Sequence, residues 1–552
     1  MFKMDSGVYT SEEWTEEEAD VLRRYFTNLD GPVFALVNLP EVVKGALFAR
    51  YSRSSKNLRR LFLDEFVRDL DISGDLSVDA TVGLARAEEL YDRVFYEYGD
   101  DSVAQLGGVH LACEQASNVL TKILERGRLM SYMEKSTRYV AYDSRLSNGR
   151  YRYYRDQEIL ESPLGARYVG DMDRLFDAYG EILAAMTVHF AEMFPKASGD
   201  SDLAWRQSVR AKAYDAVRGV LPAGATSNLG VYGSGQAYES LLIRMRSDPL
   251  PESRLYADMI LAELRKVIPS WVRRVDVADR GVAHCEYIER NAAAMGDLAE
   301  ELFGSDGSDR VDVSVAETPE VHLTDFDPDG EIKVVAAMLY PYSHLGEEAI
   351  LARAASMSGE ERMQVFLRYV GERRNRRHRP GRALERTEYR FEVVSDYGAF
   401  RDLQRHRLLS IEWQGLTACH GYSMPASIAD AGMGATFAEA MERSALLWDA
   451  LRGNFDAKQA AYAVALAFRI RYSMQLNARE AMHVTELRTS SQGHPEYRKV
   501  CQQMHEQIAS VAGHKALAAA MSFVDSSDYS TAALERLTSE NRTAASRSQR
   551  AR

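Results

Sequence analysis

A short arginine motif occurs twice in this chain, and its two copies lie about half the chain apart. Residues 126–131 read RGRLMS and residues 405–410 read RHRLLS, an offset of 405 − 126 = 279 in a chain of 552 residues. A weaker pair, FARYS at 48–52 and LYPYS at 339–343, keeps the same order at an offset of 343 − 52 = 291. Two ordered pairs favour an ancient duplication, although two unrelated helical domains would also fit.

The stretch between the two copies has the composition of a linker. Gly, Ser and Asp cluster in residues 304–318 (GSDGSDRVDVSVAET) without helical or strand periodicity. We therefore expect a first domain over residues 1–310 and a second over residues 311–525. Residues 526–552 lose apolar content, so we expect them to form a disordered tail.

The spacing of apolar residues predicts a chain rich in helices. Apolar residues recur at helical spacing in residues 102–125, 254–268 and 435–452. The best strand signals are residues 332–340 and 389–394, which are short and rich in β-branched or aromatic residues. Helices therefore outweigh a small sheet, which predicts an α/β (α+β) fold class.

Composition limits the partners and the compartment. Lys+Arg minus Asp+Glu is 68 − 81 = −13, which argues against general nucleic-acid binding because that binding needs many basic contacts to phosphates. The four cysteines form no CxxC, as in a reduced, cytoplasmic protein. We expect no signal peptide and no membrane span, because the start is acidic and no uncharged apolar run reaches about 18 residues. Metal-ligand spacing is also missing, so we expect no metal.

The arginine motif belongs to a longer series of motifs that is divided between the halves. The second half carries Arg405-His406-Arg407, Ser410, N-A-R at 477–479, L-R at 487–488 and G-H-P-E-Y at 493–497. The first half has lost the middle histidine of the arginine motif but keeps E-K-S-T-R-Y at 134–139 and R-G-V-L-P at 218–222. Each half therefore lacks motifs that the other half keeps.

Together these motifs resemble those of flavin-dependent thymidylate synthases of the ThyX type, over most of residues 40–270 and 320–515. The resemblance implies two tandem ThyX-like domains, each a small, mostly antiparallel sheet with helices. It also implies an enzyme of nucleotide biosynthesis that methylates dUMP, or a related pyrimidine nucleotide, at C5. FAD would be the cofactor, NADPH and the folate methylenetetrahydrofolate the co-substrates, and a homodimer would reproduce the family's tetramer as a pseudo-tetramer of domains.

The resemblance also assigns roles to individual residues. The implied catalytic residues are Arg405, Arg488 and Ser136. The implied nucleotide-binding residues are Glu134, Ser136, Arg138, Arg218, Arg405 and Arg488. The implied flavin-binding residues are Arg405, His406, Arg407, Asn477, Arg479, His483 and Ser343. Arginine suits a nucleotide monophosphate because its planar guanidinium matches phosphate oxygens. Because each half keeps what the other has lost, we expect one composite site per pair of domains.

Some departures from the family's pattern bear on the reaction. Trp413, Gly415 and Thr417 stand where the second half would carry the family's Glu, Ser and Arg, and Met133 stands where the first half would carry an Asn. Gly-His replaces Ala-Gln at residues 493–494. A shifted substrate, such as another uracil or cytosine nucleotide, therefore fits as well. An alternative function is a degenerate, non-catalytic homologue that binds nucleotide or flavin as a regulator or scaffold.

Several of these residues also have ordinary structural explanations. Glu134 and Arg138 could form a surface ion pair four residues apart on a helix, and Arg126 and Arg128 could be helix-end charges. The run RRNRRHR at 373–379 contains five arginines, which is typical of a solvated or partner-contacting face. It could instead attract a phosphate of NADPH or the glutamate tail of a folate.

Overall fold

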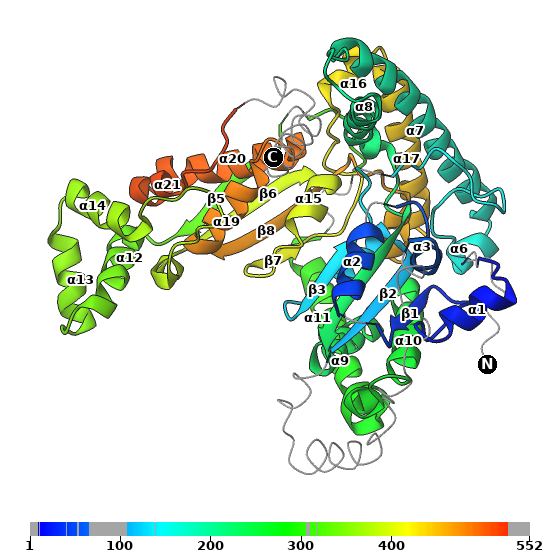
Figure 1. The fold of residues 1–552 in the computed structure, drawn as a ribbon, viewed down its shortest axis with the longest axis horizontal. Coiled ribbons are helices and arrows are strands. Elements are labelled where there is room, and N and C mark those ends of the chain that lie inside the picture. Colours follow the sequence, from blue (N-terminus) through cyan, green and yellow to red (C-terminus); the bar gives the residue numbers. More distant parts are fainter. Residues whose placement is uncertain are drawn as a thin grey trace, which may run out of the picture. The chain divides into compact units, whose positions relative to one another are not determined.

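The fold is described from a computed structural model of the chain (Figure 1). The described residues are 9, 12–39, 41–51, 54–65, 108–138, 140–304, 310–316 and 318–527. The predicted helix at 102–107 and the predicted disordered tail from residue 528 onward lie outside them. Within this part of the chain, no helix has both the length and the apolar character needed to cross a membrane.

The chain forms two compact units, and each unit contains a segment from the opposite half of the sequence. Unit 1 comprises Met1–Gly180, Leu221–Arg310 and Arg443–Val464. Unit 2 comprises Glu181–Val220, Val311–Glu442 and Ala465–Arg552. The helices that carry the chain from one unit into the other are α7 (Gly165–Met193) and α17 (Gly434–Arg452). The domains 1–310 and 311–525 stay a prediction, because a domain is a part that folds independently and compactness alone does not test this.

Unit 1 is built on a four-stranded antiparallel sheet with the order β1-β2-β4-β3. Its strands are β1 (Val33–Leu36), β2 (Gly108–Ser117), β3 (Met130–Glu134) and β4 (Thr226–Ser234). Its helices, apart from the shared α7 and α17, are α1 (Glu16–Leu22), α2 (Glu41–Tyr51), α3 (Leu58–Glu65), α5 (Asn118–Leu124), α6 (Gln157–Glu161), α9 (Gly235–Arg246), α10 (Pro251–Leu264), α11 (Ala283–Phe303) and α18 (Ala457–Ala460). Helices α2 and α3 bury Phe48, Tyr51 and Phe62 in one core cluster with Phe34 of β1.

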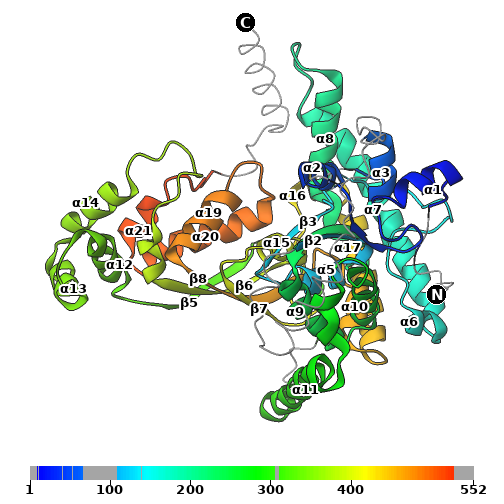
Figure 2. The ribbon, with the colours of Figure 1, turned by 60° about the horizontal axis from the view of Figure 1, so that its bottom comes forward.

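Unit 2 repeats this sheet with the order β5-β6-β8-β7, again all antiparallel. Its strands are β5 (Glu320–Phe326), β6 (Glu388–Asp396), β7 (Ser410–Trp413) and β8 (Arg469–Asn477). Its helices are α8 (Asp202–Val217), α12 (Gly330–Leu339), α13 (Glu347–Ser356), α14 (Gly359–Val370), α15 (Tyr397–Leu403), α16 (Ala426–Asp430), α19 (Ala478–Arg488), α20 (Pro495–Ser510) and α21 (Lys515–Ala520). Helix α20 packs on β5 and β6, and α12, α13 and α14 lie together (Figures 1 and 2).

The two sheets agree in register as well as in strand order. Ser131 pairs with Tyr232, two residues before the Ser234 side chain caps α9. Ser410 pairs with Gln475, two residues before the Asn477 side chain caps α19. The serines that end the two arginine motifs thus occupy the same place in each sheet. The predicted fold class is confirmed, because the chain is rich in helices with two small antiparallel sheets.

Two of the predicted elements were wrong, and buried apolar runs explain both. Residues 108–117 form strand β2 instead of a helix, because β2 is a central strand that is buried along most of its length. Residues 332–339 lie in helix α12 instead of a strand. A short apolar run does not distinguish a buried strand from a buried helix. The strand at 389–394 is confirmed, as are the helices at 254–264 and 435–452.

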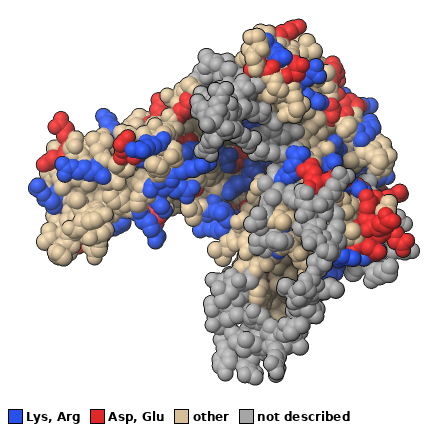
Figure 3. Space-filling view, in the orientation of Figure 1, with Lys and Arg blue, Asp and Glu red and all other residues tan. Residues whose placement is uncertain are grey.

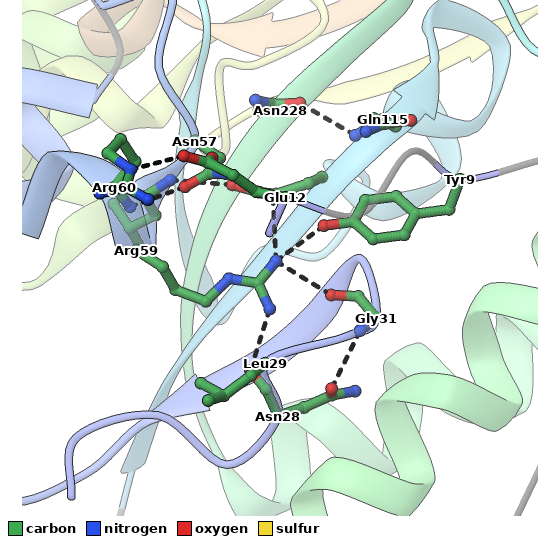
Figure 4. Close-up of polar contacts among 12 residues, drawn as sticks. Tyr9, Glu12, Asn28, Leu29, Gly31, Asn57, Arg59, Arg60, Gln115 and Asn228 are labelled. Atoms are coloured by element: carbon green, nitrogen blue, oxygen red, sulfur yellow. Dashed lines mark hydrogen bonds and ion pairs between the residues drawn. The ribbon is translucent and has the colours of Figure 1, made fainter. Parts of the chain in front are cut away.

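A buried ion pair lies at a bulge of strand β2 in unit 1. The register shifts between Cys113 and Ala116, so that two residues, Glu114 and Gln115, stand opposite one residue of β4. The Glu114 carboxylate lies 3.5 Å from Nη2 of Arg59, and both side chains are at most 2% exposed. The Arg59 guanidinium also donates to the Asn28 and Gly31 carbonyl oxygens, at 3.0 and 3.2 Å (Figure 4).

Candidate functional site

Three arginines of unit 2 converge on Asp402 near the C-terminus of α15. Arg405 forms an ion pair with Oδ1 of Asp402, and Nη1 of Arg218 lies 3.4 Å from Oδ2. Nη2 of Arg488 donates to the Asp402 carbonyl oxygen at 2.5 Å. Arg218 follows α8 and comes from the first half of the chain, whereas the other three residues come from the second half. The exchanged segment 181–220 therefore brings Arg218 to the arginine motif within one unit.

Arg218 has one buried hydrogen-bond donor that lacks an acceptor among the described residues. The residue is 5% exposed, and its Nη2 atom has no hydrogen-bond partner among the described residues. A Cβ atom at the neighbouring Gly398 would lie only 3.1 Å from this nitrogen, so the glycine leaves it room. An unsatisfied buried donor is costly, and a bound oxyanion would remove that cost.

His406 is held in one protonation state between two neighbours. Its Nε2 accepts a hydrogen bond from Nε of Arg488 at 2.9 Å, so the ring proton belongs on Nδ1, which lies 3.4 Å from Glu480. Burial, and after it the charges of Arg488 and Arg405, lower the pKa of His406 well below its ordinary value. The imidazole is therefore neutral at physiological pH, and both of its ring nitrogens face protein partners.

Ligand atoms of His406, Glu480 and His483 lie within 4.8 Å of one another, as in a metal site. A cation there would compete with the Arg488 hydrogen bond for Nε2 of His406 and would lie close to two guanidinium groups. The positive surroundings therefore disfavour a metal. The expected absence of a metal site stays a prediction.

Beside His483 lies a pocket of about 310 Å³. It is lined by Arg373, Arg376, Arg379, Pro380, Arg382, Glu385, Leu408, Asn477, Arg479, Glu480, Met482, His483 and Glu486. Its arginines outnumber its glutamates, 5 to 3. Lys and Arg side chains gather on this part of unit 2, over α19 and β7 (Figure 3). The pocket is therefore suited to an anionic ligand that also has an apolar part, or a part that can hydrogen-bond to the Asn477 amide.

Asn477, Arg479 and His483 reach this pocket from the start of α19. The Asn477 side chain accepts from the Glu480 backbone N–H at 2.9 Å and so caps the helix. Arg479 donates to the Pro380 carbonyl oxygen at 3.1 Å and to Glu385 at 3.0 Å, which fixes its guanidinium. Burial lowers the pKa of His483 to about 4, and the nearby His406, Arg379 and Arg376 act in the same direction. The negative charge of Glu480 opposes this shift.

Four expected flavin-binding residues lie outside the lining of this pocket: Arg405 and His406 near Asp402, and also Arg407 and Ser343. Arg407 is exposed in the stretch between α15 and β7. Ser343 follows the short turn Tyr340–Tyr342, and its hydroxyl accepts a hydrogen bond from the Leu345 N–H at 3.1 Å. Their role in flavin binding stays a prediction.

The remaining expected residues belong to unit 1, at and after the end of β3. Glu134 is the last residue of the strand, is 6% exposed and lies 3.5 Å from the Lys122 ammonium. The helical pairing of Glu134 with Arg138 is therefore wrong, because these residues are not on a helix. The Ser136 hydroxyl accepts from the Arg138 N–H at 3.2 Å, and both residues are half-buried.

The burial of Lys135, which lies between Glu134 and Ser136, predicts that the stability of unit 1 depends on pH. The residue is 6% exposed, and burial, with the nearby Arg152, lowers its pKa from 10.5 to about 8. Between pH 8 and 10.5 the unfolded chain therefore binds more protons, so the free energy of unfolding rises with pH. We expect Lys135→Met to remove a rise of about 2 kcal/mol between pH 8 and pH 10. Urea-dependent thiol labelling of the buried Cys113 reports on unit 1 alone and measures this at the two pH values. Lys56→Met at an exposed lysine is the control.

Unit 1 has lost the residues that make the pocket and the arginine cluster in unit 2. The helices that begin at Ser234 and Asn477 differ in number by 477 − 234 = 243. At this offset Ala461 corresponds to Arg218, and each begins a 3₁₀ turn. At the same offset Gln236, Ser240 and Met245 correspond to Arg479, His483 and Arg488. The pocket chemistry of unit 2 therefore has no counterpart at these positions of unit 1.

Sequence reasoning missed Asp402, Glu480 and the part played by Arg376 and Arg379. Asp402 lies three residues before the arginine motif and Glu480 directly follows N-A-R, so proximity to known motifs was the signal available. The arginine run stands out in the sequence, but its place at the pocket depends on packing against residues far along the chain.

Comparison with known proteins gives matches in both halves of the chain. The family described as thymidylate synthase complementing protein (Thy1) matches residues 46–270 and 322–513. A UPF0159 protein of Chlamydia muridarum is 38% identical over 536 residues, which are 96% of this chain and 98% of that protein. A UPF0159 protein of Thermoplasma acidophilum is 32% identical over 512 residues, 88% of this chain and 96% of that protein. A solved structure of a UMP/dUMP methylase from Streptomyces cacaoi, bound with 5-Br dUMP, is 19% identical, covers 38% of this chain and 97% of its own, and has a TM-score of 0.31.

Proposed function

We infer, from the fact that this chain belongs to the thymidylate synthase complementing protein family, a function for it. We propose that it is a flavin-dependent methylase that acts at C5 of a pyrimidine nucleotide such as dUMP. Membership rests on a match to the family over both halves of the chain. It confirms the resemblance drawn from the motifs. The substrate, the cofactor and the composite site are proposals that rest on the residues of the site.

The observation that carries the proposal is the convergence of Arg218, Arg405 and Arg488 on Asp402. Three guanidinium groups from three separate segments present donors around one point in unit 2. A nucleotide monophosphate is a dianion, and bidentate guanidinium contacts match its oxygens. Asp402 keeps the three arginines from separating before the nucleotide arrives. Arg218, with its unpartnered Nη2, is the arginine with a donor available to phosphate.

The residues of the neighbouring pocket fit a flavin. Pockets for cofactor-sized ligands run from about 300 to 1,000 Å³, so the 310 Å³ here would take part of a dinucleotide. Asn477 offers an amide to the uncharged, hydrogen-bonding edge of a flavin ring, and His406, whose ring packs against that of His483, adds a neutral aromatic face beside the pocket. When bound, a flavin would supply the hydride chemistry of the reaction.

In this proposal the nucleotide is held by residues of both units. Arg138 and Ser136, which follow β3, would bind it together with Arg218, Arg405 and Arg488. An arginine near a uracil carbonyl stabilises the negative charge that develops on the ring when C5 becomes nucleophilic. Unit 1 supplies E-K-S-T-R and unit 2 supplies the arginine motif, so one chain would contribute the parts of one composite site.

The proposal predicts a yellow protein. We expect the purified chain, or the chain after addition of FAD, to show flavin absorbance. It should then convert dUMP to dTMP when methylenetetrahydrofolate and NADPH are supplied. Chromatography of the nucleotide products measures this. A colourless protein that takes up no FAD would contradict the flavin proposal, and flavin binding without turnover of any uracil or cytosine nucleotide would favour a regulatory homologue.

A further inference from the structure

The arginine run at residues 373–379 is an ordered loop that is anchored by its first residue. Arg373 forms a bidentate pair with Glu486 of α19, with both distances 2.6 Å, and the two side chains are 4% and 2% exposed. Arg373 also donates to the His378 and Ala520 carbonyl oxygens at 2.7 and 3.2 Å. A buried bidentate pair with all its donors used holds the loop against α19.

Side chains within the loop fix its remaining turns. The Asn375 carboxamide oxygen accepts from the Arg377 N–H at 2.9 Å, and Nδ1 of His378 accepts from the Arg374 N–H at 3.4 Å. These local bonds resemble Asx turns, which shape a loop without secondary structure. The loop therefore has a defined shape, which a merely solvated run of arginines does not require.

This shape leaves two arginines at the pocket without an ion pair, although the charge of Arg379 acts on Glu480. Arg373, Arg382 and Arg479 of the pocket are paired with Glu486 or Glu385. Arg376 and Arg379 line the same pocket, and neither has an ion-pair partner among the described residues. Both add to the positive field at His483, where they help to lower the pKa of that imidazole.

We propose that Arg376 and Arg379 form a phosphate-binding subsite at the edge of this pocket. The subsite takes a phosphate group of a dinucleotide whose ring occupies the part of the pocket near Asn477 and His483. The identity of the ring rests on the proposed function. The phosphate subsite itself rests on the position of Arg376 and Arg379 in the anchored loop. Two guanidinium groups that line one small pocket from a single loop can both contact the oxygens of one phosphate.

Phosphate is favoured over a carboxylate tail by the geometry of the loop. A phosphate presents several oxygens at one point, whereas the carboxylates of a glutamate tail are spread along a flexible chain. Arg376 and Arg379 are three residues apart in one anchored loop and line one small pocket. The dinucleotide has two possible sources, the flavin cofactor and the nicotinamide co-substrate, which share the phosphate chemistry.

The test is calorimetric titration of the full chain with inorganic pyrophosphate and with ADP. We expect Arg376→Ala/Arg379→Ala to weaken binding of both by about 100-fold at low salt, roughly tenfold for each arginine. Arg374→Ala/Arg377→Ala removes the same charge from the same loop at exposed positions that do not line the pocket, so it should change the affinity less than threefold. Equal effects of the two double variants, or no binding to the parent chain, would overturn the subsite.

Matched ligands then identify the source of the phosphate. If the Arg376→Ala/Arg379→Ala variant loses affinity for FAD but not for riboflavin, the phosphates are those of the flavin. If it loses affinity for NADPH but not for NADH, the phosphate is that of the co-substrate. Displacement by triglutamate but not by pyrophosphate would contradict the phosphate assignment. A chain that binds pyrophosphate through this loop but no flavin would disprove the proposed function and leave the subsite standing.

Discussion

Replacing Arg405 by alanine is expected to weaken dUMP binding by at least about 100-fold. The substitution removes a guanidinium that would hold the nucleotide and also breaks the ion pair with Asp402. A charge-assisted hydrogen bond contributes about 1.5–3 kcal/mol, and the carboxylate left behind would repel the phosphate. Calorimetric titration with dUMP measures the loss. Circular dichroism of the variant shows whether the fold is kept.

The duplication supplies a matched control for this experiment. Arg126 occupies the position of Arg405 in the first arginine motif and is exposed after the end of α5. Its motif has lost the histidine, so Arg126→Ala should change the affinity less than threefold. If the nucleotide is held as proposed by motifs of both halves, Arg138→Ala should cost as much as Arg405→Ala. Equal losses for Arg126→Ala and Arg405→Ala would point to two sites, and no loss for Arg138→Ala would contradict the composite site.

Replacing Glu114 by alanine is expected to destabilise unit 1 by about 3–5 kcal/mol, since it leaves a buried arginine without its counter-charge. Arg59 is 0% exposed, and Glu114 is its carboxylate partner at 3.5 Å. Glu114 also accepts hydrogen bonds from the Tyr51 hydroxyl and the Leu58 N–H, both at 2.9 Å. The substitution therefore leaves two buried donors, the Tyr51 hydroxyl and the Leu58 N–H, without this acceptor and the Arg59 guanidinium without its counter-charge.

Hydrogen exchange of the β2 amides measures this effect on unit 1 alone, because a chain with two compact units does not unfold in a single two-state step. Glu65→Ala is the control, since Glu65 pairs with Arg50 at 2.7 Å and their side chains are 32% and 55% exposed. An exposed pair contributes about 0–1 kcal/mol. If the two variants opened with the same free energy, the buried pair at the bulge would not stabilise unit 1.

Much of the fold could be predicted from local patterns, and the failures have one cause. Helix α17 and strand β6 have a periodicity that their neighbours in space do not override. Apolar residues of the buried central strand β2 recur at a spacing that also fits a helix, and the short apolar run in helix α12 also fits a strand. In such segments the tertiary neighbours choose between strand and helix.

The candidate site shows the same division. The arginine motif, N-A-R and Arg488 were found from sequence because their order and spacing are local properties. Asp402 was missed, although it contacts three of the arginines, because a single carboxylate carries no pattern. The arginine run was ambiguous by sequence. Its anchoring by Arg373 depends on Glu486, which lies 113 residues further along the chain.

The amino-acid sequence by itself determined the family's motifs and their unequal survival in the two halves, because these are contained in residue order. It favoured a duplication, and the equal strand order of the two sheets supports it. Only the tertiary structure decided that Arg218, from the first half, belongs to the unit that contains Arg405, and that Ala461 takes its place in unit 1. The physical reason is that helices α7 and α17 carry segments into the opposite unit. Where such a segment is buried depends on contacts far apart in sequence, and no local spacing records them.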